Sequence, residues 1–396
     1  MKTAVTESKL IDCAGVLKSN ADWSRAFDLC MRKARRNIQR LADEPKSAPW
    51  AVDGNYFAHP EGFNEIGNWT SSFLTGMALI AWRETEDEFF LRQLLRLAPA
   101  YREKAFNPRF HSHHDMGFLY SLYSVALYKL TGDRQHRESG LLAAEALYQR
   151  FNHRGNFIRA WGQLGTDDQE NMAIIDCMMN LPLLYWASQE SGDKKFHDIA
   201  VRQADTTLKC FIRPDDSVFH AYRFDLKTGQ PIGGDNYCGR GVDTHWARGT
   251  GWAIYGFVLS HRYTGDKKYL DASLRLARKF NQELNGDAVP VWDFKLPAGE
   301  TPLRDSSAAA VVVCGYQELE KFGAADALII KTKESLLNHI CTDTYLNSDE
   351  SCPGILRNGQ VGSDGPGSAR NAYMSWGDYY LMEALDRELH KGETWW

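Results

Sequence analysis

Three stretches of the chain share one sequence pattern: Leu127–Leu147 reads LYKLTGDRQHRESGLLAAEAL, Trp186–Leu208 reads WASQESGDKKFHDIAVRQADTTL, and Ser260–Phe280 reads SHRYTGDKKYLDASLRLARKF. Each runs from an apolar segment through Gly-Asp into a segment with apolar residues at helical spacing. Glycine supplies the positive φ that ends one helix, and the aspartate can cap the next. This repeated pattern therefore predicts helical hairpins. Weaker copies lie at Ala81–Tyr101 and Leu319–Ile340.

The two halves of each hairpin differ in polarity. The second segments alternate apolar and charged residues, whereas the first are more continuously apolar, as in Leu119–Leu130, Met172–Ala187 and Gly251–Leu259. This asymmetry predicts a buried inner layer and a half-exposed outer layer. Helices near Trp23–Leu41 and Tyr373–Leu389 bring the number to about twelve. We therefore predict an all-α fold, an (α/α)₆ barrel; a helical solenoid shares the local pattern but is more regularly spaced.

Long insertions interrupt the hairpins and are rich in Gly, Pro and aromatic residues. They are Trp50–Trp69, Asn152–Gln169, Pro214–Thr250, Pro290–Pro302 and Cys352–Asn371. Loops of this length in a compact protein usually carry function or cover a site. Because no low-complexity linker divides the chain, we expect one catalytic domain over residues 1–396.

Composition excludes several classes of protein. The net charge of −5, from 46 basic and 51 acidic residues, is too balanced for a nucleic-acid or anionic-membrane partner. The first twenty residues lack a signal-peptide core, and no apolar run is long enough for a membrane span. The eight cysteines form no C-x-x-C pair, so we expect buried thiols in a reducing cytoplasm and no structural zinc.

A carboxylate stands in an apolar context at Asp176, within Asn171-Met-Ala-Ile-Ile-Asp-Cys-Met-Met-Asn. Burying a carboxylate is costly unless it is partnered or protonated. Burial disfavours the charged form of a carboxyl group, which is the tuning that a general acid needs near neutral pH. The alternative is a structural aspartate that ties down a loop through backbone N–H groups.

A second cluster of ionisable residues is His111-Ser-His-His-Asp115, directly before another predicted inner helix. The spacing fits no strong metal template. Asp115 is either a plain helix cap or the partner of Asp176. Since both aspartates stand at the starts of inner helices, a barrel would bring them to one mouth.

The third motif is Trp246-Ala-Arg-Gly-Thr-Gly-Trp252. Arg248 and Trp252 are four residues apart and so share a helical face. An arginine near a helix N-terminus opposes the helix dipole and calls for an anion. A sugar carboxylate gripped by the guanidinium is one candidate; a structural Asp or Glu is the other.

Together these motifs resemble those of the unsaturated glucuronyl hydrolases, glycoside hydrolase family 88. The matching segments are His114–Phe118, Ile174–Ala187 and Trp246–Gly256, in the expected order. The resemblance as a whole runs from about Trp69 to the C-terminus. The resemblance implies an (α/α)₆ barrel without metal or cofactor. Its substrate would be an oligosaccharide ending in a 4,5-unsaturated uronic acid, left by a polysaccharide lyase. Oligomeric state stays open between monomer and dimer.

The resemblance also implies roles for individual residues. Asp176 matches the general acid/base, and Asp115 matches a carboxylate that binds ring hydroxyls and helps to set the protonation of the first. The matching substrate contacts are Trp69, His114, Trp161, His220, Arg248 and Trp252. Cys238 stands where family members often carry Gln. Ser368 and Arg370 could meet a sulfate group, but Asp364 would oppose it, so preference for sulfated substrates stays open.

Three other functions compete with this prediction. An unsaturated rhamnogalacturonyl hydrolase would use the same barrel on pectin fragments. A sugar epimerase or isomerase would need an acid–base pair of histidines, for which His114 and His220 are candidates. A carbohydrate-binding protein would keep the aromatic mouth without turnover.

Overall fold

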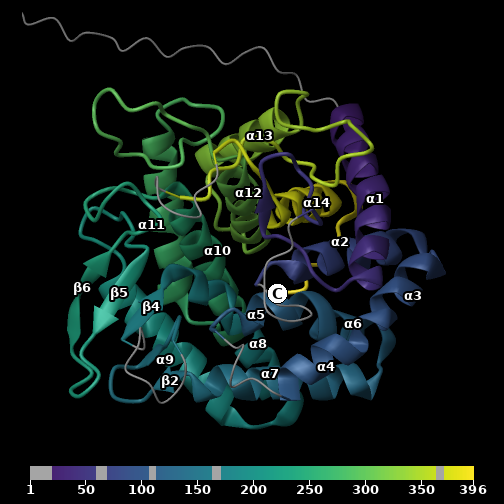
Figure 1. The fold of residues 1–396 in the computed structure, drawn as a ribbon. Coiled ribbons are helices and arrows are strands. Elements are labelled where there is room, and N and C mark those ends of the chain that lie inside the picture. The colour runs from purple at the N-terminus through teal and green to yellow at the C-terminus, as the bar shows by residue number, and fades with distance from the viewer. Residues whose placement is uncertain (1–19, 59–68, 107–112, 163–170, 363–369) are drawn as a thin grey trace, which may run out of the picture.

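A computed structural model of the chain describes residues 20–58, 69–106, 113–162, 171–362 and 370–396. Helices dominate these segments, and most of them follow one another as antiparallel hairpins (Figure 1). Within the described segments, no helix combines the length and the apolar character that crossing a bilayer requires.

Within the described segments the helices form six pairs, the last of which joins the last helix to the first. The pairs are α2 (Ser71–Thr85) with α3 (Glu88–Arg96), α6 (Ala126–Thr131) with α7 (Arg134–Gln149), α8 (Leu181–Ser191) with α9 (Lys194–Cys210), α10 (Ala247–Thr264) with α11 (Lys267–Leu284), α12 (Ser306–Lys321) with α13 (Ala327–Ile340), and α14 (Ser375–His390) with α1 (Asn20–Asp43). A short α4 (Ala98–Phe106) follows α3. The inner helix of the second pair begins as α5 (Met116–Tyr120) and passes through one π-helical segment, Ser121–Val125, into α6.

The Gly-Asp turns are built as predicted. Gly132, Gly192 and Gly265 have positive φ angles of 71°, 76° and 69°. Each lies in open space, so backbone conformation and not packing selects glycine there. The aspartate after each glycine caps the next helix by accepting a hydrogen bond, at 2.8 to 3.0 Å, from the amide two residues further on.

The inner helices close a ring. α2 packs on α5, α5 on α8, α8 on α10, α10 on α12, α12 on α14, and α14 on α2, while α1 lies outside α2 and α14 (Figure 1). The inner α10 is buried at every position from Ala247 to Ser260, whereas α11 is buried along one face only. The predicted (α/α)₆ barrel with two layers is confirmed.

The sequence suggested that the insertions are irregular loops, but parts of them form β-strands. Part of them forms an antiparallel sheet of β4 (Met172–Ile174), β5 (Ala221–Phe224) and β6 (Pro231–Asp235). Two smaller pairs join β1 (Trp50–Ala51) to β7 (Tyr373–Met374) and β2 (Phe151–Asn152) to β3 (Phe157–Ile158). Strands this short, with two glycines in β6, show no clear alternation in sequence.

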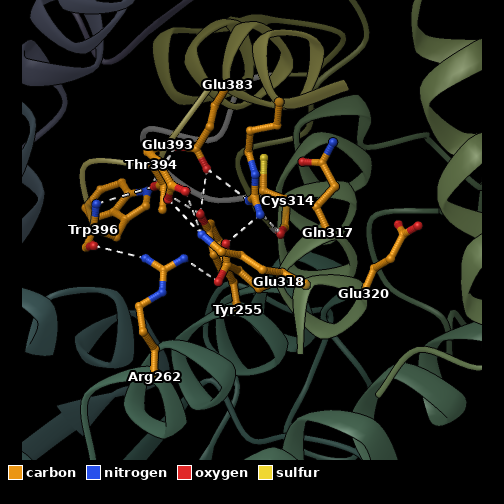
Figure 2. Close-up of polar contacts among 12 residues, drawn as sticks. Tyr255, Arg262, Cys314, Gln317, Glu318, Glu320, Glu383, Glu393, Thr394 and Trp396 are labelled. Carbon is orange, nitrogen blue, oxygen red and sulfur yellow. Dashed lines mark hydrogen bonds and ion pairs between the residues drawn. The ribbon is translucent and has the colours of Figure 1, made fainter. Parts of the chain in front are cut away.

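A buried polar network joins α10, α12 and α14 to the C-terminal residues (Figure 2). The Glu383 carboxylate accepts hydrogen bonds from the hydroxyl groups of Tyr255 and Tyr379, both at 2.5 Å, and from the Trp396 indole at 3.1 Å. Nearby, Glu318 accepts from Arg387 at 2.5 Å. Cysteines contribute to the core as free thiols, and Cys30, Cys177, Cys314 and Cys341 are buried.

Candidate active site

The three-stranded sheet brings the side chains of Asp176 and His220 together at one end of its strands. β4 pairs antiparallel with β5 so that Ile174 faces Ala221, and Asp235 of β6 faces the same alanine. Asp176 follows the end of β4, and His220 precedes the start of β5. The Ile175 amide donates to the His220 carbonyl at 2.8 Å, which fixes the two backbones at this point.

His220 faces the Asp176 carboxylate. Its Nε2 lies 3.5 Å from Asp176 Oδ2, and its Nδ1 accepts a hydrogen bond from the Cys238 amide at 3.3 Å. An accepting Nδ1 leaves the ring proton on Nε2, directed at the carboxylate. Burial lowers the pKa of His220, but Cys238 and Asp176 raise it, to about 9 overall, which favours a second proton on the ring at neutral pH. Uptake of that proton at Nδ1 would displace the Cys238 amide.

Asp176 does not tie down a loop in the described part of the chain. Its side chain is almost buried, yet Oδ2 has no hydrogen-bond partner among the described residues. A structural aspartate in such a place would accept backbone N–H groups. Within the described segments, the neighbour of Asp176 Oδ2 is His220 Nε2, at 3.5 Å.

Asp115 occupies the N-cap position of α5, but its carboxylate makes no capping hydrogen bond. The amide that it would cap, at Phe118, donates to Asn180 Oδ1 at 2.8 Å instead. Asp115 Oδ2 lies 2.9 Å from His113 Nδ1, and Asp115 Oδ1 lies 3.2 Å from His114 Nε2. Burial raises the pKa of Asp115, but His114, His113 and Asn180 together outweigh burial and hold the pKa below its usual value. Asp115 is therefore ionised at neutral pH.

Asn180 links the two aspartates. Its Nδ2 donates to Asp115 Oδ1 at 3.2 Å and to the Asp176 carbonyl at 3.3 Å. Gly117 makes this approach possible, since a Cβ there would lie 2.3 Å from the Asn180 Cα. One amide from the turn before α8 thus caps α5 and orients Asp115.

Replacing this amide should disturb the site without unfolding the barrel. We expect Asn180→Ala to lower kcat about 100-fold, since a misplaced catalytic group can cost that much. Loss of its hydrogen bond should also raise the pKa of Asp115, moving the acid limb of the pH–rate profile to higher pH. Asn281→Ala removes a hydrogen-bonded amide on α11 and should leave the profile unchanged. An unshifted acid limb in Asn180→Ala would contradict the positioning role.

Aromatic rings stand around the carboxylates. The Trp161 Nε1 donates to the Tyr237 hydroxyl at 3.0 Å. Trp161 also lies edge-on to His114, with 5.6 Å between ring centroids, and Tyr237 contacts His220 at 4.2 Å. Trp161 is half-buried and Tyr237 is 41% exposed, so both can present a face to a sugar. Burial, Cys238 and both aspartates raise the Tyr237 pKa, although its bond from Trp161 lowers it, so the phenol stays protonated.

Two further aromatic candidates pack against other rings. The half-buried Trp69 stacks on Trp376, with 5.0 Å between centroids, and packs against Phe118. Trp252 has no exposed surface and packs between Phe118 and Tyr380. The structure therefore places Trp252 behind the first layer of aromatic rings, in the core of the barrel.

Arg248 has the structural partner that the sequence left open as an alternative. Its guanidinium pairs with the buried Asp305 and donates to the carbonyls of Gln360 at 2.8 Å and Val361 at 2.7 Å. With its charge matched inside the protein, Arg248 fixes the segment before residue 363. Of the two residues considered for a sulfate group, Arg370 is exposed, and Ser368 lies outside the described residues.

Sequence reasoning missed Asn180 and Tyr237. Asn180 lies in an apolar segment. A single side-chain amide in such a segment indicates a buried hydrogen-bonding residue, and this signal could have identified it. Tyr237 is adjacent to Cys238, but only the pairing of β5 with β6 brings it to the site. Among the described residues, the metal-like cluster of donor atoms is elsewhere, at Glu84, Asp386 and His390.

Comparison with known proteins gives one consistent family. Residues 47–268 match the model of Glycosyl Hydrolase Family 88. The chain is 35% identical to the unsaturated chondroitin disaccharide hydrolase of Streptococcus pneumoniae, over 96% of this chain and 95% of that protein. The crystal structure of the unsaturated glucuronyl hydrolase of Bacillus sp. GL1 aligns with a TM-score of 0.86 at 30% identity, over 94% of this chain and 99% of that one.

A second solved structure contains an oligosaccharide. It is a variant of the unsaturated glucuronyl hydrolase of Streptococcus agalactiae in complex with dGlcA-GalNAc6S. It aligns with a TM-score of 0.81 at 26% identity, and the alignment covers 100% of both chains.

Proposed function

The chain belongs to glycoside hydrolase family 88, and we propose that it removes a terminal 4,5-unsaturated uronic acid from oligosaccharides that polysaccharide lyases produce. The observation that carries this proposal is the pair of buried aspartates linked by Asn180. One of them, Asp115, is held ionised, and the other, Asp176, has an open oxygen beside His220. Two carboxyl groups in different environments can have different roles, one as the general acid and the other as a carboxylate that binds the substrate.

The proposed reaction is hydration of the C4=C5 enol ether. Protonated Asp176 donates its proton to C4, and positive charge develops at C5 and the ring oxygen. Water adds at C5 and returns a proton to the Asp176 carboxylate, so the acid is regenerated. The resulting hemiketal opens at the bond between C5 and the ring oxygen. The hemiacetal left at C1 then collapses to an aldehyde and releases the rest of the oligosaccharide.

The surrounding residues have supporting roles in this proposal. Ionised Asp115 accepts hydrogen bonds from the sugar hydroxyls, while Trp161 and Tyr237 present aromatic faces to the flat unsaturated ring. The Nε2–H of His220 points at Asp176 and favours the carboxylate that forms after proton transfer. Buried His114 has its Nε2 3.2 Å from Asp115 Oδ1, and its Nδ1 has no hydrogen-bond partner among the described residues, so His114 can contribute to substrate binding through Nδ1.

The histidines do not match the epimerase alternative. That reaction needs two histidines facing one sugar carbon, whereas His114 Nε2 lies beside Asp115 and His220 Nε2 lies beside Asp176. We place the protein in the cytoplasm, because its buried free thiols suit a reducing compartment. It would act there as a monomer or a dimer on imported fragments.

A panel of unsaturated fragments tests the substrate class. We expect loss of the ultraviolet absorbance of the conjugated uronate with disaccharides from chondroitin, hyaluronan or heparin, or with gellan and xanthan fragments. Relative kcat/KM across the panel identifies the neighbouring sugar and the effect of sulfation. Unchanged absorbance with every member, together with turnover of an unsaturated rhamnogalacturonan fragment, would contradict the proposal.

A further inference from the structure

Three potential metal ligands meet where α2 and α14 end. Glu84 lies in the last turn of α2, and Asp386 and His390 lie four residues apart on one face of α14. One donor atom from each lies within 4.8 Å of the others. His390 Nδ1 is 3.5 Å from Asp386 Oδ1 and 3.7 Å from Glu84 Oε2. Neighbouring ligands of a tetrahedral ion with bonds of about 2.0 Å are about 3.3 Å apart, so small shifts suffice.

Arg83 orients both carboxylates. Its Nε donates to Glu84 Oε1 at 3.1 Å, and its terminal nitrogen pairs with Asp386 Oδ2. The other oxygen of each carboxylate therefore faces His390. Arg83 is itself held by the Glu393 carbonyl, at 2.7 Å, and by stacking on Trp395. Hydrogen bonds of this kind from outside the ligand set are typical of metal sites.

One buried carboxylate oxygen of the cluster makes no hydrogen bond among the described residues. Asp386 is 1% exposed, and its Oδ1 has no hydrogen-bond partner among the described residues. A buried oxygen in this state is costly unless a cation meets it.

We propose that Glu84, Asp386 and His390 bind a divalent transition-metal ion, with Zn²⁺ as the best fit. One imidazole and two carboxylates are ligands that zinc accepts, and water completes the tetrahedron. The ion can enter from solvent, since the side chains of His390 and Glu84 are 38% and 21% exposed. Calcium is a poorer fit, because it prefers six or more oxygen ligands.

The bound ion would tie α2 to α14 away from the candidate active site. Ser375 begins α14 beside the mouth, and His390 ends it about 22 Å further along the axis. The ion therefore stabilises the contact between α2 and α14 and, through Arg83, the C-terminal segment.

Zinc titration of the chelator-treated full chain tests the site. Calorimetry with ZnCl₂ at pH 7 should show one saturable site, and zinc should raise the Tm. His390→Gln and Glu84→Gln, at partly exposed positions that keep the fold, should each weaken binding more than 100-fold, since even outer partners of metal ligands contribute 10- to 100-fold. His197→Gln alters an exposed histidine beside Asp198 and should bind zinc as the unmodified chain does.

Two results would overturn the proposal. The first is the absence of saturable zinc binding by the unmodified chain. The second is an equal affinity and an equal rise in Tm in His390→Gln and Glu84→Gln, because zinc would then bind elsewhere.

Discussion

Asp176→Asn should lower kcat by about 10²- to 10⁴-fold, the range by which a positioned general acid–base accelerates a reaction. The amide has nearly the same shape as the carboxyl group but cannot deliver a proton to C4 of the substrate. The loss should appear in kcat, because Asp115 and the aromatic rings that bind the sugar are unchanged. The measurement is the initial rate of absorbance loss with a good disaccharide substrate.

The matched control is Asp225→Asn, which makes the same change in a turn after β5, where Asp225 accepts from the Lys227 and Thr228 amides. It should keep the kcat of the unmodified chain. Circular dichroism and Tm should show that both variants fold. A folded Asp176→Asn variant with near-normal kcat would refute the assignment of the acid.

Glu383→Leu should cost about 3–5 kcal/mol of unfolding free energy, the range for breaking a buried ionic network at one partner. Glu383 is 2% exposed, and its loss leaves the Tyr379 and Trp396 donors without this acceptor. The Tyr255 hydroxyl would keep only its longer contact with Thr394 Oγ1, at 3.3 Å (Figure 2). It also removes a carboxylate 3.9 Å from Arg387. Denaturant unfolding, followed by tryptophan fluorescence, measures the change.

Glu145→Gln is the control for that experiment. Glu145 pairs with Lys195 at 2.8 Å, but the two side chains are 38% and 37% exposed. Such a surface pair contributes less than about 1 kcal/mol. An equally small effect of Glu383→Leu would mean that the network contributes little to stability.

The barrel could be predicted because its signal is local. Each Gly-Asp turn determines a helix end and a helix start within three residues, and the contrast between the apolar α10 and the one-sided α11 separates the two layers. The sheet of β4, β5 and β6 could not be predicted, since its pairing depends on contacts between Ile174 and Ala221, which the α8–α9 helix pair separates in sequence.

The site was predictable where one residue was out of place in its own segment. Asp176 is a charged residue within an apolar segment, and Asp115 is an ionisable residue at the start of a predicted helix. The choice between a substrate anion and a protein anion for Arg248 depended on Asp305, which is distant in sequence. Asn180 acts on Phe118 and Asp115 only after α5 and α8 pack together, so no local pattern indicates its role.

Proton delivery to C4 is the central claim, and the reaction in D₂O tests it most directly. Samples quenched early and examined by NMR should contain product with one deuterium at C4, in a single stereochemical configuration, because a fixed carboxyl group protonates one face of the ring. A mixture of both C4 configurations from the earliest time points would mean that the enzyme cleaves at the anomeric carbon and that C4 is protonated later in solution.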